Sequence, residues 1–256
     1  MSVLEVRDIA KAFGGVQAVG GISFALAAGE LLALIGPNGA GKSTCFNLLN
    51  GQLVPDRGSV TLLGRDITGW KPRAIWRLGV GRTFQITATF ASMTVRENIQ
   101  MALISHGGRS RALFPRADRM FVDEAMALLE RVGMQDQYDR ACSVLAYGDL
   151  KRVELAVALA NKPKLLLMDE PTAGMAPKER VALMALTAEI VRREDISVLF
   201  TEHSMDVVFA YADRIIVLAR GRLIAEGTPA AIRDHPKVQE VYFGSGKTFE
   251  KRAAAT

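Results

Sequence analysis

Residues 36–44 read GPNGAGKST, and this segment constrains the fold of the chain more than any other. It follows a short apolar run at 30–35, which predicts a buried strand, and it leads into a helical pattern at 42–50. The segment matches G-x-x-x-x-G-K-[ST] in full, a loop whose glycines let successive backbone N–H groups turn inward around phosphate oxygens. The N-terminus of the following helix adds partial positive charge. We therefore expect a phosphate-binding loop between a strand and a helix of an α/β sheet.

Individual side chains of this loop have distinct expected roles in binding ATP and Mg²⁺. Lys42 is expected to reach the β- and γ-phosphates, Ser43 to offer its hydroxyl to Mg²⁺, and Thr44 to help hold the α-phosphate. The expected nucleotide-binding residues of the loop are Gly36, Pro37, Asn38, Gly39, Ala40, Gly41, Lys42, Ser43 and Thr44.

A second segment, LLLMDE at 165–170, is an apolar strand pattern that ends in two carboxylates. In isolation Asp-Glu-Pro also describes a plain strand-to-loop turn, but the upstream phosphate loop favours a catalytic interpretation. Asp169 fits the strand-end acid that holds Mg²⁺ in P-loop ATPases, directly or through water. Glu170 is expected to extend from the strand tip and to polarise the attacking water as a general base.

Composition restricts the class of protein without selecting a function. The chain has 256 residues, of which 49% are hydrophobic and 23% charged, as expected for one α/β domain with a smaller insertion. No apolar run approaches the roughly 20 residues that span a bilayer, so any membrane role is expected to be peripheral. The net charge of +5 would suit a membrane surface or a polyanion. Because the basic residues are scattered and not interleaved with aromatics, no nucleic-acid partner is expected. Cys45 and Cys142 have no metal-ligand spacing and are expected to be buried thiols.

Periodicity along the chain predicts strands at both ends and helices in the middle. Helical patterns occupy 95–105, 120–132 and 150–160, which together suggest a helical insertion, and a further helix is predicted at 177–192. The predicted strands are 3–9, 22–26, 30–35, 57–63, 164–168, 197–201, 214–219 and 222–226, the last two joined at Arg220-Gly221. The residues after 244 show no periodicity.

Together these residues resemble one family, the nucleotide-binding subunits of ABC transporters. In order along the chain, Phe13 in KAFGG matches the aromatic that stacks on adenine, and Gln85 in VGRTFQ matches the glutamine that contacts Mg²⁺ and the attacking water. LAYGDL at 145–150 stands where the family has its LSGGQ signature, and His203 in LFTEH matches the histidine that senses the γ-phosphate. The resemblance implies catalytic roles for Glu170, His203 and Gln85. It also implies Mg²⁺ binding by Ser43, Gln85 and Asp169.

The resemblance implies an α/β P-loop NTPase fold with a RecA-like, mainly parallel sheet, an N-terminal antiparallel β part and an inserted helical subdomain. The implied nucleotide-binding domain is 1–244, with a catalytic core at about 1–85 and 161–232, a helical subdomain at about 86–160, and a C-terminal helix or tail at 233–256. Two such subunits, as a homodimer or heterodimer, are expected to bury two ATP molecules, each held by the phosphate loop of one subunit and the signature segment of the other.

Two segments depart from the family's commonest pattern. The signature segment contributes Ala146, Tyr147, Gly148 and Asp149, so it lacks the usual serine hydroxyl, and we expect backbone N–H groups near Gly148 to contact the nucleotide instead. Ala176 stands where many relatives carry an aspartate that couples the two active sites.

Both departures are similar to the ATPases of branched-chain (hydrophobic) amino-acid importers, as is EGTPAAIRDHPKVQEVYFG at 226–244. The resemblance implies transmembrane permease subunits as partners, an indirect substrate-binding protein, and a peripheral location on the cytoplasmic face of the plasma membrane. Urea or amide uptake and lipopolysaccharide export remain alternatives, because the motor subunit does not touch the cargo. A soluble ABC ATPase acting on nucleic acid or ribosomes is a more distant one.

Overall fold

The computed structural model describes residues 2–83, 89–107 and 119–243, so Gln85 lies outside the described residues. The chain forms two compact units, each described by itself below. The first, called unit 1, comprises residues 1–75 and 197–256, and the second, unit 2, comprises 76–196. The predicted division into a core and a helical subdomain at 86–160 stays a prediction.

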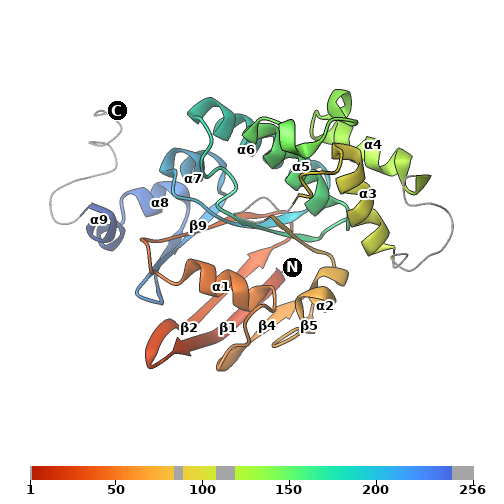
Figure 1. Cartoon of the computed structure of the whole chain (residues 1–256). Helices are drawn as coiled ribbons and strands as arrows, with labels where there is room; N and C mark the ends of the chain where they lie inside the picture. The colour runs from red at the N-terminus through yellow and green to blue at the C-terminus, as the bar shows by residue number, and fades with distance from the viewer. Residues whose placement is uncertain (1, 84–88, 108–118, 244–256) are drawn as a thin grey trace. The chain divides into compact units, whose positions relative to one another are not determined.

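An antiparallel sheet forms the N-terminal part of unit 1 (Figure 1). Its strands lie in the order β2 (Val16–Ala27), β1 (Ser2–Phe13), β4 (Arg57–Leu62) and β5 (Arg65–Asp66). The predicted strands at 3–9, 22–26 and 57–63 are confirmed, but the first two are longer than predicted. They extend because β1 and β2 form a hairpin that pairs as far as Phe13 with Val16. The sequence did not predict this end of the hairpin, because its exposed residues show no apolar alternation.

The remaining strands of unit 1 surround β3 (Leu31–Ile35), every residue of which is buried. Strand β3 pairs in parallel with β8 (Ser197–Thr201) on one side and with β9 (Arg214–Ala219) on the other. Strand β10 (Arg222–Gly227) pairs antiparallel with β9 through the predicted turn at Arg220-Gly221. The apolar run before the phosphate loop is therefore a buried central strand, as the sequence predicted.

The helices of unit 1 are short. Helix α1 (Lys42–Leu49) follows the phosphate loop and packs against β2 (Figure 1). Helices α7 (Met205–Tyr211), α8 (Pro229–Arg233) and α9 (Pro236–Phe243) follow β8 and β10. Helix α9 lies within 233–256, where a C-terminal helix or tail was predicted. Helices α7 and α8 were not predicted, because their seven and five residues are fewer than the roughly 11 over which apolar periodicity is judged. Helix α8 has local signals, since Thr228 caps it and Pro229 occupies its first turn.

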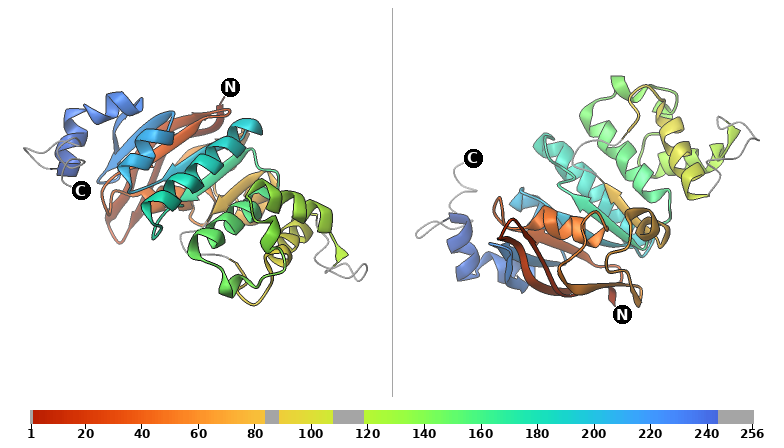
Figure 2. Two further views of the ribbon diagram at one scale, coloured as in Figure 1. Left: turned by 90° about the horizontal axis from the view of Figure 1, so that it is seen from above. Right: turned by 60° about the horizontal axis from the view of Figure 1, so that its bottom comes forward.

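Unit 2 combines two parallel strands with four longer helices. Strand β6 (Val80–Thr83) pairs in parallel with β7 (Leu165–Asp169). The helices are α3 (Val95–His106), α4 (Val122–Arg131), α5 (Tyr147–Leu159) and α6 (Pro177–Arg193). Helices α3, α4 and α5 pack on one another, and they are visible as the yellow-green to green-teal helices of Figure 2. Helix α2 (Pro72–Arg77), at the boundary of the two units, and β6 were not predicted.

Helix starts in unit 2 follow from local capping. Thr94 accepts a hydrogen bond from the Glu97 backbone N–H at 3.2 Å, and Glu97 accepts one in return from the Thr94 N–H at 2.8 Å. Helix α5 begins at Tyr147, three residues before the predicted start at 150. The predicted boundary was wrong because Tyr147 and Gly148 are weak helix formers, whereas in the fold they make its first turn.

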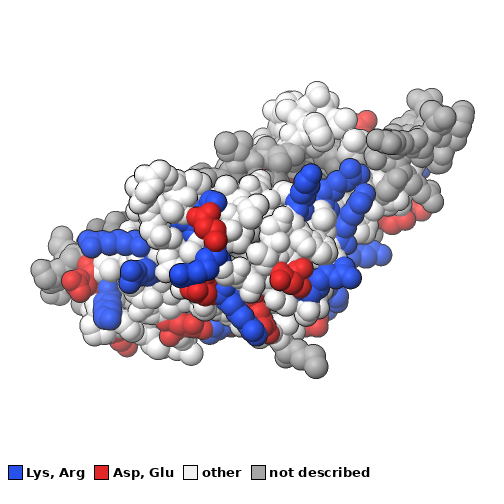
Figure 3. Space-filling model, turned by 90° about the horizontal axis from the view of Figure 1, so that it is seen from below, with Lys and Arg blue, Asp and Glu red and all other residues white. Residues whose placement is uncertain are grey.

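Two surface properties bear on partners. Among the described residues, no helix is long and apolar enough to cross a membrane. On the face drawn in Figure 3, Lys and Arg side chains lie among Asp and Glu side chains over most of the surface.

Candidate functional site

Glycine is required at two positions of the phosphate loop. A Cβ atom at Gly36 would lie 2.3 Å from the Leu218 carbonyl oxygen, and one at Gly41 would lie 2.4 Å from the Ala18 carbonyl oxygen. Gly41 also has a φ of +101°, which side chains disfavour. By contrast, a Cβ at Gly39 would meet nothing within 4 Å. Close approach of backbone therefore shapes the ends of the loop, while its tip stays open.

Backbone hydrogen bonds from the two hairpins of unit 1 hold the loop. The Gly221 N–H, at the β9–β10 turn, donates to the Ala40 carbonyl at 3.0 Å. The Gly20 N–H of β2 donates to the Gly221 carbonyl at 2.7 Å. The loop is thus hydrogen-bonded to the β9–β10 turn, which is in turn hydrogen-bonded to β2, and both lie far from the loop in sequence.

Lys42 points back into the loop from the first turn of α1. Its Nζ donates to the Gly36 carbonyl at 2.7 Å and to the Pro37 carbonyl at 3.3 Å, and the residue is only 7% exposed. Ser43 is exposed and Thr44 is half-buried at the same helix end. A buried ammonium inside a backbone nest is suited to bind a polyphosphate.

The two remaining candidate residues of unit 1 lie at strand ends. Phe13 ends β1, is 47% exposed, and has the Lys11 Nζ 5.8 Å from its ring centroid. The β1–β2 hairpin that carries Phe13 also brings Ala18 to Gly41, so one hairpin supports both features. His203 is exposed in the segment between β8 and α7, and its backbone N–H donates to the Glu202 carboxylate at 3.1 Å. Its predicted position after a strand is confirmed, whereas its role stays a prediction.

In unit 2 the paired carboxylates stand at the end of β7. Asp169 is the last residue of this fully buried strand and is 8% exposed. Glu170 follows with a φ of +50°, which turns the chain sharply away from the strand direction. This conformation is rare for a residue with a side chain, and such strain is often found at functional sites.

Arg82, to which the sequence analysis assigned no role, lies beside Asp169. Its guanidinium nitrogen is 3.8 Å from the Asp169 carboxylate, because β6 and β7 pair in parallel register. Burial lowers the pKa of Arg82, and the Asp169 charge opposes this shift. No local pattern reveals this contact, since the pairing of β6 with β7 alone creates it.

The donor atoms available fit Mg²⁺. The Asp169 carboxylate and the Ser43 hydroxyl are hard oxygen ligands, the class that Mg²⁺ prefers. The described residues contain no cluster of three or more His, Cys, Asp or Glu side chains able to hold a metal. Such a cluster is not needed, because Mg²⁺ usually keeps several waters and binds one or two protein ligands together with phosphates.

The signature segment forms the start of α5. Ala146 is the N-cap with extended backbone, and Tyr147, Gly148 and Asp149 form the first turn. Asp149 accepts a hydrogen bond from the Gln137 side chain at 3.2 Å. The first N–H groups of a helix have no acceptor within it, so backbone donors gather near Gly148, while their contact with a nucleotide stays a prediction.

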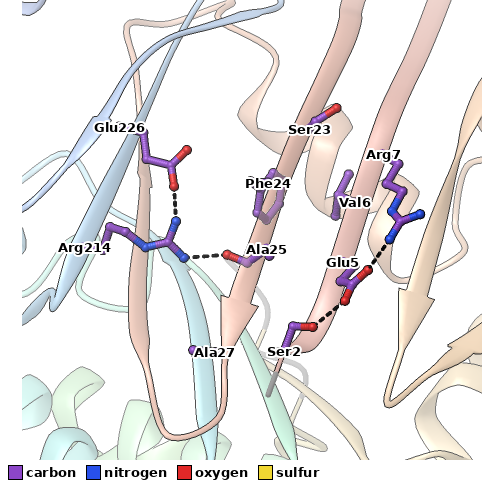
Figure 4. A pocket seen from close by; sticks show the side chains of 10 residues that line it. All are labelled: Ser2, Glu5, Val6, Arg7, Ser23, Phe24, Ala25, Ala27, Arg214 and Glu226. Atoms are coloured by element: carbon purple, nitrogen blue, oxygen red, sulfur yellow. Dashed lines mark hydrogen bonds and ion pairs between the residues drawn. The ribbon is translucent and has the colours of Figure 1, made fainter.

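A separate hollow of about 610 Å³ lies on the N-terminal sheet of unit 1 (Figure 4). Arg214 crosses its rim, where it contacts the Glu226 carboxylate and the Ala25 carbonyl, and it also pairs with Glu30 at 2.7 Å. Arg7 pairs with Glu5, two residues away on β1, at 2.9 Å. These charges already pair with one another, and no phosphate-loop residue lines the hollow, so we assign it no role.

Comparison with known proteins gives consistent matches over nearly the whole chain. The ABC transporter family model matches residues 19–173, and the model of the branched-chain amino acid ATP-binding cassette transporter matches 222–248. The chain is similar to the high-affinity branched-chain amino acid transport ATP-binding protein LivG of Salmonella typhimurium, with 40% identity over 94% of this chain and 98% of LivG. It is 38% identical to the corresponding protein BraF of Pseudomonas aeruginosa, with the same coverage.

The crystal structure of the ADP conformation of MJ1267, an ATP-binding cassette of an ABC transporter, is similar in fold. The TM-score is 0.86 at 33% identity, and the match covers 96% of this chain and 100% of that structure. The predicted fold class is confirmed by this likeness.

Proposed function

Since this chain belongs to the ATP-binding subunits of ABC transporters, we propose that it hydrolyses ATP to drive uptake of branched-chain amino acids. The observation that carries the amino-acid assignment is the similarity to LivG and BraF over 94% of this chain. The match of 222–248 to the branched-chain amino acid transporter model supports the same branch. Urea or amide uptake and lipopolysaccharide export are therefore less favoured.

The phosphate loop is proposed to bind the triphosphate of ATP. The close approaches at Gly36 and Gly41 fix a backbone nest around Lys42, and anion binding there is favoured by inward N–H groups and by the N-terminus of α1. Lys42 would exchange its loop carbonyl acceptors for phosphate oxygens. Phe13, exposed on the β1–β2 hairpin, is proposed to stack on adenine.

Mg²⁺ is proposed to be held by Ser43 and Asp169, together with Gln85, which lies outside the described residues. When bound, the ion would neutralise charge that develops on the phosphate oxygens. Arg82 supports this role, because its guanidinium lies 3.8 Å from the Asp169 carboxylate and can orient it.

Hydrolysis is proposed to depend on Glu170, which accepts a proton from the attacking water, and on His203, which donates a hydrogen bond to the γ-phosphate. Phosphoryl transfer needs positioning and charge neutralisation more than covalent catalysis, and this set contains no nucleophile. The left-handed backbone at Glu170 would direct its carboxylate away from the end of β7.

A second ATP-binding subunit is proposed to complete each site. The signature residues Ala146, Tyr147, Gly148 and Asp149 would offer backbone N–H groups to the γ-phosphate bound by the partner's loop. Loss of that phosphate on hydrolysis would open the dimer and so change the state of the transporter. The permease subunits expected for any transporter ATPase would place the chain on the cytoplasmic face of the membrane.

ATP hydrolysis by the wild-type chain and by Glu170→Gln tests this proposal. The variant is expected to lose at least about 100-fold in rate, as for removal of a general base, and to accumulate as an ATP-bound dimer in size-exclusion chromatography. Glu189→Gln, which changes an exposed carboxylate on α6, is the matched control and is expected to behave as wild type. Equal rates for the wild type and Glu170→Gln would refute Glu170 as the base.

A transport assay tests the cargo. Cells in which Glu170→Gln replaces the wild-type chain are expected to lose uptake of radiolabelled leucine and to retain uptake of urea. Loss of urea uptake alone would contradict the amino-acid assignment.

A further inference from the structure

The Tyr147 ring covers the backbone of Gly174, a residue of the segment that follows Glu170. A Cβ atom built on Gly174 would lie 3.4 Å from Tyr147 Cε1 and 3.8 Å from both Cζ and Oη. These distances are ordinary van der Waals contact, so the ring borders the space in which a side chain at Gly174 would point. The first turn of α5 therefore touches the 170–176 segment within the same chain.

A neighbouring contact joins the same two segments. A Cβ at Gly148 would lie 3.6 Å from Met175 Cε and 3.5 Å from Glu179 Oε1. Glu179 in turn accepts a hydrogen bond from the Ala176 N–H at 3.1 Å, at the start of α6. The signature residues thus pack on the far end of the segment as well as on Gly174.

Lys151 also contacts the Tyr147 ring. Its Nζ lies 5.4 Å from the ring centroid, within the range of a cation–π contact. The same ammonium pairs with Glu154 at 2.9 Å, and both side chains are almost fully buried, at 3% and 5% exposed. The ring therefore contacts both a buried cation and Gly174, although Tyr147 is 41% exposed.

The ring contacts the part of the segment that is least anchored by burial. Pro171, Thr172 and Met175 are buried, and the Ala173 N–H donates to the Glu170 carbonyl at 3.1 Å. Gly174 is exposed and has a φ of +78°. Because glycine there adds backbone freedom, an outside contact is needed to hold one conformation.

We propose that Tyr147 is a positioning residue for hydrolysis, which holds the segment after Glu170 in place within its own subunit. The proposal rests on the proposed function, since it assumes that Glu170 is the general base. A small residue at 147, such as the glycine of the commonest signature, could not make this contact. The Tyr147 ring would thus hold the 170–176 segment from within its own subunit. Ala176 lacks the aspartate that many relatives carry at this position.

Steady-state ATP hydrolysis by position 147 variants tests the proposal. Tyr147→Ala is expected to lower kcat about tenfold, since small displacements of a catalytic group cost this much or more, with KM for ATP within twofold of wild type. Tyr147→Phe keeps the ring and is expected to stay within twofold of wild type in both constants. Val181→Ala, which truncates another exposed apolar side chain of unit 2, is the control and should not change kcat.

Two further variants separate positioning from dimer contact and from folding. In the Glu170→Gln background, Tyr147→Ala is expected to leave the ATP-bound dimer intact, because the ring acts on the hydrolytic step. Gly174→Ala strains the same segment, so it should also lower kcat. The double variant with Tyr147→Ala should lose less kcat than the product of the two single fold-losses.

Several results would overturn the proposal. The first is an unchanged kcat in Tyr147→Ala. The second is a loss of kcat in Tyr147→Phe as large as in Tyr147→Ala, and the third is loss of the trapped dimer. Either of the last two would point to direct contact of Tyr147 with the nucleotide of the partner. Failure of the proposed function is distinguishable, because it would appear as equal rates for the wild type and Glu170→Gln whatever the residue at 147.

Discussion

The buried ion pair of Lys151 and Glu154 offers a quantitative test of how unit 2 is stabilised. Their charged groups are 2.9 Å apart, and the side chains are 3% and 5% exposed. Removing one partner of a buried ion pair costs about 3–5 kcal/mol. Lys151→Met keeps the length of the side chain and removes the charge, so it should destabilise the protein by about this amount.

The expected change in melting temperature follows from chain size. An unfolding entropy of about 2.1 cal/mol/K per residue gives about 0.54 kcal/mol/K for this chain, so Lys151→Met should lower Tm by about 6–9 °C. Replacing both partners, as in Lys151→Met/Glu154→Leu, removes both charges and should return Tm to within about 2 °C of wild type.

Thermal unfolding followed by circular dichroism measures these values. The control is Arg7→Met, which removes the exposed pair of Arg7 with Glu5, at 76% and 36% exposed, and should leave Tm almost unchanged. If Lys151→Met lowers Tm by less than about 2 °C, or if the double variant is no more stable than the single one, the argument that burial of the charge sets the cost is refuted.

Two further predictions concern the phosphate loop and its helix. Gly41→Ala should weaken ATP binding about 5- to 150-fold in a fluorescent-nucleotide titration, because the new Cβ would lie 2.4 Å from the Ala18 carbonyl and overpacking costs about 1–3 kcal/mol. Gly39→Ala is its control, because Gly39 also has a positive φ (+77°) whereas a Cβ there has open space, so equal Kd values for the two would contradict the steric argument. Burial raises the pKa of the Cys45 thiol from 9.0 to about 12, so above pH 9 the unfolded chain releases a proton that the folded chain keeps. Stability should therefore fall by up to about 1.4 kcal/mol per pH unit between pH 9 and 12, and urea unfolding of Cys45→Ala should show a shallower alkaline decline than wild type.

Prediction from sequence succeeded where a segment has a full period and a clear boundary. The strands at 31–35 and 165–169 are short apolar runs that end at turn-forming or charged residues, and both are fully buried in the structure. Prediction failed for β5, β6, α2, α7 and α8, because so few residues carry no reliable apolar pattern.

The sequence by itself determined the phosphate loop, the paired carboxylates at the end of β7 and the family, because each depends on consecutive residues or on their order. Only the tertiary structure decided that Arg82 lies beside Asp169, that Ala18 and Gly221 brace the loop, and that Tyr147 covers Gly174. Such contacts join residues far apart in the chain, and strand register and helix packing decide which of them meet. No local pattern carries that information, since the same residues would show the same periodicity in any other arrangement.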